Sequence, residues 1–115
     1  MDKYTRTYQG QSYRVVSTLS LQGQELFQIQ EPVTVRYWFQ KRTEWVTVGI
    51  NPTNGFRTRR ILPYAGGTIS LPFYPIQRTS LEKAEEKYRE IIDSEQRFRE
   101  AKKAQKAYGT KVVPR

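Results

Sequence analysis

The spacing of apolar residues changes near residue 79, and this change constrains the fold more than any other feature of the chain. Before it, apolar and polar side chains alternate, most clearly over residues 33–39. After it, Leu81, Ala84, Tyr88 and Ile91 follow a spacing of three and four. Alternation is typical of strands and the wider spacing of helices. The sequence therefore predicts an α+β fold, an antiparallel meander of about five strands followed by one long C-terminal helix.

Turn-forming residues divide the first half of the chain into the expected strands. Gln22-Gly23-Gln24 and the segment 51–55, which ends in Asn-Gly, are rich in turn chemistry. Pro32 cannot donate a ladder hydrogen bond and is expected at the start of a strand. Lys41-Arg42-Thr43 is expected to be a hairpin loop. The expected strands are then residues 13–21, 26–30, 33–39, 44–50 and 56–62.

The expected helix begins at a capping box. Thr79 would accept a bond from the backbone amide three residues on, while Glu82 would reach back to the amide of Thr79. Gly109 is a suitable residue to follow the end of the helix. A helix of this extent is about 42 Å long at 1.5 Å per residue, which is longer than a small sheet. Its second half is therefore expected to protrude, and homodimerisation through it is one alternative.

The domain organisation follows from these elements. Residues 1–12 are polar and are expected to form an N-terminal arm or a short edge strand. One domain is expected over residues 13–108, because 115 residues can bury one sizeable core. Within it lie the sheet (13–62), a loop rich in proline and aromatic residues (63–78) and the helix (79–108). Residues 109–115 would form a basic tail.

The composition argues against catalysis. The chain contains no cysteine and no histidine, so disulfides, thiolate zinc sites and the commonest general base are excluded. Carboxylates outside the helix are sparse, and they do not cluster as a metal-dependent nuclease would require. We expect no enzyme activity and no cofactor or metal. No apolar run approaches the length of a membrane span, so a cytoplasmic protein is the default expectation.

The formal net charge of +9 and the isoelectric point near 10.0 predict an anionic partner. Nucleic acid is the first candidate. An acidic protein surface or an anionic membrane surface would satisfy the same long-range electrostatics.

Residues 36–45 contain both tryptophans of the chain, interleaved with cations. If the aliphatic residues of strands 33–39 and 44–50 face the core, the opposite face carries Arg36, Trp38, Gln40, Trp45 and Thr47, with Lys41 and Arg42 in the connecting loop. Aromatic rings that stack on bases, flanked by cations that neutralise phosphates, are typical of single-strand binding. The alternative is that Trp38 and Trp45 form a cross-strand pair covered by the helix.

Further cations extend this candidate surface. In the fifth expected strand Arg57 and Arg59 share one side and Arg60 lies on the other. Residues 79–96 carry three cations and six carboxylates, whereas residues 97–115 carry seven cations and one carboxylate. The helix dipole favours that direction, but its effect fades within a turn. We expect Lys102, Lys103 and Lys106 to contact a partner.

The favoured hypothesis is a non-catalytic nucleic-acid-binding protein that prefers a single strand. The alternative is an adaptor, inhibitor or assembly subunit that docks on an acidic protein. In that case Phe73, Tyr74 and Phe98 would supply apolar contacts, unless the loop aromatics instead close one end of the core.

Overall fold

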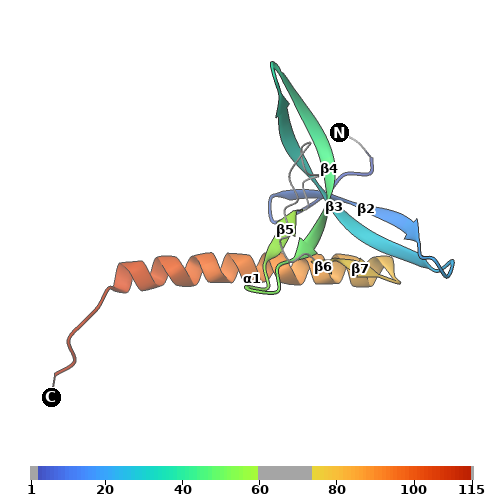
Figure 1. The fold of residues 1–115 in the computed structure, drawn as a ribbon. Coiled ribbons are helices and arrows are strands. Elements are labelled where there is room, and N and C mark those ends of the chain that lie inside the picture. Colours follow the sequence, from blue (N-terminus) through green and yellow to red (C-terminus); the bar gives the residue numbers. More distant parts are fainter. Residues whose placement is uncertain (1–2, 60–73, 115) are drawn as a thin grey trace.

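The computed structural model describes residues 3–59 and 74–114, and it shows a curled antiparallel sheet crossed by one long helix (Figure 1). The predicted α+β class, a five-stranded meander followed by a C-terminal helix, is confirmed. The elements in chain order are β1 (Arg6–Tyr8), β2 (Gln11–Leu19), β3 (Glu25–Tyr37), β4 (Gln40–Ile50), β5 (Arg57–Arg59), β6 (Tyr74–Pro75), β7 (Gln77–Arg78) and α1 (Leu81–Tyr108).

Strand β3 is the central element, and it is one strand where two were predicted. Its first half pairs with β2, from Glu25 opposite Leu19 to Gln30 opposite Arg14. Its second half pairs with β4 as far as residue 37. The prediction that Pro32 begins a new strand is wrong. Because the pairing with β2 ends at Gln30, β3 has a free edge at Pro32, and a proline there removes no ladder bond.

The turn between β3 and β4 also differs from the prediction. Residues 37 and 40 pair with each other, so Trp38 and Phe39 form the loop and Lys41 already lies in β4. The expected loop at residues 41–43 is therefore wrong. The expected core position of Phe39 is wrong as well, since this side chain is 95% exposed. Gln40 lies directly opposite residue 37, and paired residues share one face of the sheet. Gln40 is therefore on the face opposite the one predicted for it.

The segment 74–78 fills the wedge where β3 and β4 diverge. Strand β6 pairs with the end of β4, and β7 pairs with the start of β3. Between them, Ile76 is fully buried and its N–H donates to the carbonyl oxygen of Val48 at 3.0 Å. Of the predicted fifth strand, residues 57–59 are observed. Residues 60–62 lie outside the described residues.

The core lies between one face of the sheet and α1. Tyr13, Ile29, Val48 and Ile76 contribute from the strand side. Four helix residues meet them, and the rings of Tyr13 and Tyr88 are 4.6 Å apart. The helical stripe predicted from the sequence is buried at Ala84, Tyr88, Ile91 and Ile92.

The helix begins one residue later than the predicted capping box. Ser80 is the N-cap, with extended backbone angles, and it makes no side-chain bond to the helix amides. The assignment of Thr79 to this role is wrong. Ser80 Oγ instead donates to Glu82 Oε2 at 2.7 Å, which lowers the pKa of that carboxyl. At the other end, Gly109 has a φ of 69° and donates to the carbonyl of Gln105, as expected for a terminating glycine.

The N-terminal residues belong to the fold. Strand β1 pairs with β2, so the edge-strand alternative is the one observed. The Tyr8 hydroxyl donates to the Asp93 carboxylate at 2.8 Å, and Arg6 forms an ion pair with Glu85. The predicted boundary at residue 12 therefore falls inside β2, and both strands of this hairpin are tied to the helix or the core.

A buried carboxylate joins three elements. Glu31 of β3 is 1% exposed, and it accepts hydrogen bonds from Arg57, Arg59 and Tyr88. Arg57 also donates to Glu95 of the helix at 2.9 Å. Since a buried charge is tolerated only when it is paired and hydrogen-bonded, this network fixes β5 and α1 against β3.

The network makes stability sensitive to alkaline pH. Burial of Tyr88, together with its hydrogen bond to Glu31, raises the pKa of the Tyr88 hydroxyl far above its ordinary value. The folded state therefore retains a proton that the unfolded state loses above about pH 10. Stability should be fully present below that pH and fall above it. In a spectrophotometric tyrosinate titration, the Tyr88→Phe variant is expected to lose one late-ionising group relative to the unchanged protein.

Candidate nucleic-acid interface

The second half of β3 and the first half of β4 form a two-stranded arm, residues 32–45, that projects from the core (Figure 1). Beyond Gln30, β2 no longer pairs with β3, and no other described strand pairs with the arm. A two-stranded hairpin without a third strand is marginally stable in water. The arm therefore adds little to the stability of the core, and the exposed residues at its tip are available to a partner.

The tip of the arm carries two large rings in solvent. Trp38 is 86% exposed, and among the described residues its ring partner is Phe39, with centroids 6.2 Å apart. Trp38 has a φ of 52°, a left-handed conformation. Two-residue hairpin loops favour glycine or asparagine at such positions, and other residues there are strained by about 1–3 kcal/mol. The tip thus combines backbone strain with apolar exposure.

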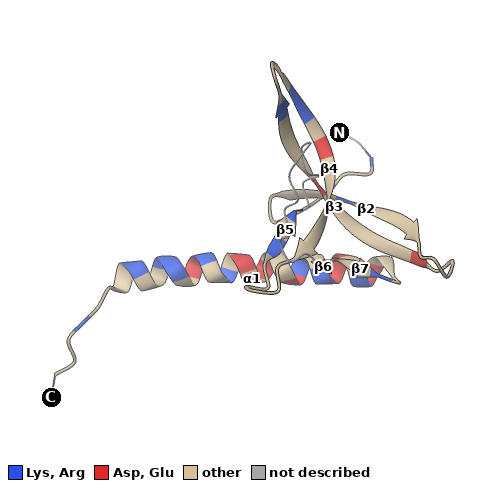
Figure 2. Cartoon of the chain, in the orientation of Figure 1, with Lys and Arg blue, Asp and Glu red and all other residues tan. Residues whose placement is uncertain are grey.

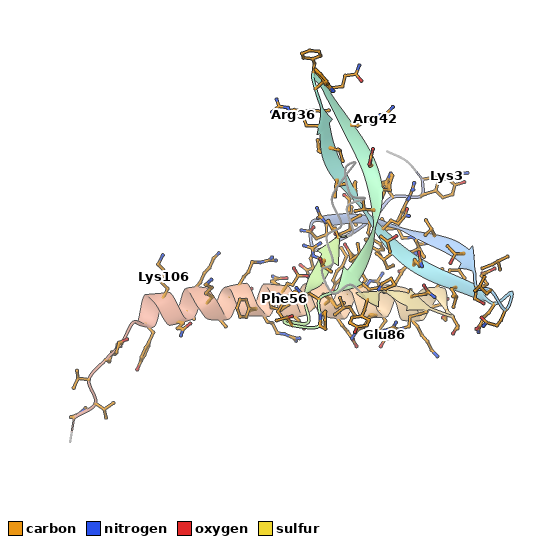
Figure 3. All side chains as sticks on the ribbon, in the orientation of Figure 1. Lys3, Arg36, Arg42, Phe56, Glu86 and Lys106 are labelled. Carbon is orange, nitrogen blue, oxygen red and sulfur yellow. The ribbon has the colours of Figure 1, made fainter. Side chains whose placement is uncertain are left out.

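The arm also carries three exposed cations. Arg36 and Lys41 are opposite each other in the register and share one face, while Arg42 pairs with Val35 and lies on the other. Figure 3 shows Arg36 and Arg42 pointing away from the arm on opposite sides. Within the described parts of the chain none of the three is held in an ion pair. Their charge is therefore directed to solvent just below the rings.

Trp45 does not belong to this tip. It lies opposite Pro32 at the base of the arm, and Pro32 is six residues, or about 20 Å at 3.3 Å per residue, along β3 from Trp38. Its ring is half-buried and is covered by the Arg14 guanidinium, 4.5 Å from the ring centroid. Arg14 is itself held by Gln30 at 2.8 Å. The two tryptophans neither pair with each other nor lie under the helix, so the predicted cross-strand pair is wrong.

The arginines predicted to extend the candidate surface do not lie beside the tryptophans. Arg57 and Arg59 do share a side, but they pair with Ile50 and Val48 and therefore lie on the helix face of the sheet. Both are engaged by Glu31. The expectation that they lie beside Trp38 and Trp45 is wrong, because their strand presents them to the buried carboxylate. Arg60 lies outside the described residues.

The end of α1 forms a second basic element. Every residue from 97 to 114 is exposed, and Lys102, Lys103 and Lys106 are among them. Figure 2 shows positive residues dominating this end, whereas acidic residues concentrate where the helix crosses the sheet. The helix end therefore projects charge without burying an apolar face.

Two of the three residues expected to bind a protein partner are described, and they lie on different elements. Phe98 is 53% exposed and its ring makes an edge contact with Phe56, with centroids 5.2 Å apart. Tyr74 is 62% exposed and lies in β6 at the end of β4. Phe73 lies outside the described residues. Of the two described residues, Phe98 is the one that adjoins the basic helix end.

Sequence reasoning missed two features, one at the tip of the arm and one in the core. Phe39 was assigned to the core because the alternation continues to the end of β3 without marking the turn. Phe39 is instead the second exposed ring of the tip, and the signal for it was the Trp-Phe pair flanked by Arg36 and Lys41 on both sides. The buried Glu31 was missed as well, although it lies in phase with Ile29 and Val33 on the apolar side of β3.

The described arrangement provides positive charge and flat rings. Among the described residues no group of three or more potential metal-ligating side chains comes together. Likewise, the helix those residues form lacks the length of apolar sequence needed to cross a bilayer. Comparison with protein-family models, with curated proteins and with solved structures found no match to this chain.

Proposed function

We propose that the protein is a non-catalytic nucleic-acid-binding protein whose main contact element is the arm formed by β3 and β4. The observation that carries the proposal is the tip, where Trp38 and Phe39 are almost wholly exposed directly above Arg36, Lys41 and Arg42. Nucleic acid offers both complements to this surface, since it presents π-faces to the rings and phosphates to the cations.

A single strand is the favoured ligand. Unpaired bases expose faces on which Trp38 and Phe39 can stack, and each stacked base is worth about 1–3 kcal/mol. The rings are inclined at 54° to each other, so they cannot both lie parallel to one base. We infer that they contact different bases.

The strain at Trp38 supports a binding role over a structural one. No described residue other than Phe39 makes a ring contact with it that would offset the left-handed backbone. An acidic protein could match the charge of the arm. The two described apolar residues expected for such docking, Tyr74 and Phe98, are however on other elements than the arm.

The two tryptophans allow a direct test by fluorescence. In a Trp45→Phe variant the remaining emission comes from Trp38, and we expect a short oligothymidylate to quench it strongly. In the matched Trp38→Phe variant the emission comes from Trp45, already covered by Arg14, and quenching should be weak. If no DNA or RNA oligonucleotide quenches either variant, nucleic-acid binding through the arm is excluded.

A glycine at the tip separates binding from stability. Trp38→Gly should relieve the positive-φ strain, so the free energy of unfolding is expected to stay unchanged or rise by up to about 1 kcal/mol. Affinity for the oligonucleotide should fall about tenfold through loss of one stacked base. Chemical denaturation and fluorescence anisotropy measure the two quantities. A parallel loss of both would show that Trp38 has a structural role.

A further inference from the structure

A polar hollow lies between the turn that joins β1 to β2 and the second half of α1. It has a volume of about 300 Å³, and it is lined by Gln9, Gln96, Arg99, Glu100 and Lys103. The four helix residues are spaced by three and four, so they share one face of the helix. Gln9 approaches that face from the turn. The hollow is therefore built by two elements that are distant in sequence.

The turn holds Gln9 in an unusual backbone conformation. Gln9 has a φ of 50°, and with Trp38 it is one of two residues other than glycine at positive φ in the described chain. The turn pairs Tyr8 with Gln11, so Gln9 and Gly10 form a two-residue loop in which asparagine or glycine is preferred at the first position. Glutamine has a longer side chain than asparagine, and here that length lets it line the hollow.

We propose that this hollow binds a phosphate group. Arg99 offers a planar fork of donors, Lys103 a compact charge, and the side-chain amides of Gln9 and Gln96 neutral donors. A phosphate can accept from all four, and charge-assisted bonds of this kind are the strong ones. With Glu100 included, the lining has a net charge of +1, which favours an anion.

Glu100 is the one group in the hollow that opposes an anion. It accepts a bond from Gln96 Nε2 at 3.4 Å, which is long for a hydrogen bond. Gln96 can therefore exchange this partner for a phosphate oxygen at small cost, while the Glu100 carboxylate repels the ligand. The affinity of the hollow is limited by this residue, and removing its charge should strengthen binding.

The phosphate can come from free phosphate or from a nucleic-acid backbone, and the second source rests on the proposed function. Lys102 and Lys106 lie one residue before and three residues after Lys103 on the exposed helix end. A backbone phosphate held in the hollow would place neighbouring phosphates near these lysines. The hollow would then be a second contact, separate from the arm.

Inorganic phosphate is the first probe. Its binding to the full chain is measured by NMR of the glutamine side-chain amides. We expect saturable shifts of the Gln9 and Gln96 amide signals. Arg99→Gln and Lys103→Gln should each weaken phosphate binding about tenfold, and Glu100→Gln should strengthen it several-fold. The control is Lys83→Gln, which removes one charge from the hollow formed by Arg78, Lys83, Glu86, Lys87 and Glu90 and should leave the affinity unchanged.

Two results would overturn the proposal. One is that potassium chloride at matched ionic strength produces the same shifts. The other is that Arg99→Gln and Lys103→Gln lose no more affinity than Lys83→Gln.

A second titration with oligothymidylate distinguishes the sources. If it shifts the same amide signals and competes with phosphate, the hollow takes the backbone. If phosphate binds there but the oligonucleotide neither shifts these signals nor quenches Trp38, the phosphate site stands and the proposed nucleic-acid function fails.

Discussion

Replacing Glu31 with alanine is expected to lower the free energy of unfolding by about 3 kcal/mol. Removing one partner of a buried ion pair leaves the other charge without compensation, which costs about 3–5 kcal/mol. The lower end applies here because Arg57 keeps its bonds to Glu95 and Gln11. Arg59 is itself partly exposed and can be solvated, whereas the Tyr88 hydroxyl is left without its acceptor. Urea denaturation followed by far-ultraviolet circular dichroism measures the change.

Two further variants show whether the charge or the contact matters. Glu31→Gln keeps an oxygen that can accept from Tyr88 but loses the charge, so its loss of stability should be smaller than that of Glu31→Ala. Glu90→Ala removes an exposed carboxylate whose ion pair with Lys87 is long, at 3.8 Å. That surface pair should contribute less than about 0.5 kcal/mol. A Glu31→Ala variant as stable as Glu90→Ala would show that the network does not fix the helix to the sheet.

The fold class could be predicted because the two periods in the sequence are unambiguous. Val46 and Val48 face the helix while Trp45 faces away from it, as the alternation predicted. The turn at Trp38 and Phe39 could not be predicted in the same way. Large rings are rare at positive φ, and residues 38 and 39 include no glycine or asparagine that would mark a loop. Lys41-Arg42-Thr43 was therefore predicted as the loop, because it is more polar than Trp38-Phe39.

Pairing between residues distant in sequence explains the other errors. The alternation in β5 placed Arg57 and Arg59 on a common side, but which side faces α1 depends on the register with β4. Cations in a short strand were therefore assigned to the surface. The signal available was Glu31, a carboxylate in phase with Ile29 and Val33. A charged residue on an apolar face requires an opposite charge nearby, and arginine is the residue best suited to a buried pair.

The candidate site was predictable in composition but not in geometry. The stretch 36–45 was identified from its rings and cations, and all of it lies in the arm. The sequence could not show that Trp38 and Trp45 lie at opposite ends of the arm, because their separation depends on where the hairpin turns. Nor could it show the hollow beside α1, since Gln9 meets Arg99 and Lys103 only through the docking of β1 against the helix.

The combined substitution of Arg36, Lys41 and Arg42 by glutamine is expected to lower oligonucleotide affinity about 100-fold at 0.1 M salt. Each phosphate contact on a single strand contributes about 0.7 to the slope of log affinity against log salt concentration. Three lost contacts should therefore make the slope less steep by about 2, and the affinity at 0.1 M salt should fall by about two orders of magnitude. Because the three side chains are exposed on the arm, stability should change by less than about 0.5 kcal/mol. Anisotropy titrations at several salt concentrations measure both affinity and slope.

The matched control removes the same charge from the first half of α1, at Lys83, Lys87 and Arg89. Lys87 is paired with Glu90 and Arg89 with Glu85, so these cations lie among carboxylates that already neutralise them. The control should weaken binding by less than about tenfold and leave the slope nearly unchanged, because only the general attraction of the positive net charge is reduced. Equal losses in the two triple variants would show that affinity follows net charge alone. The arm would then be no more than one part of a uniformly basic surface, and the exposure of its rings would need a different explanation.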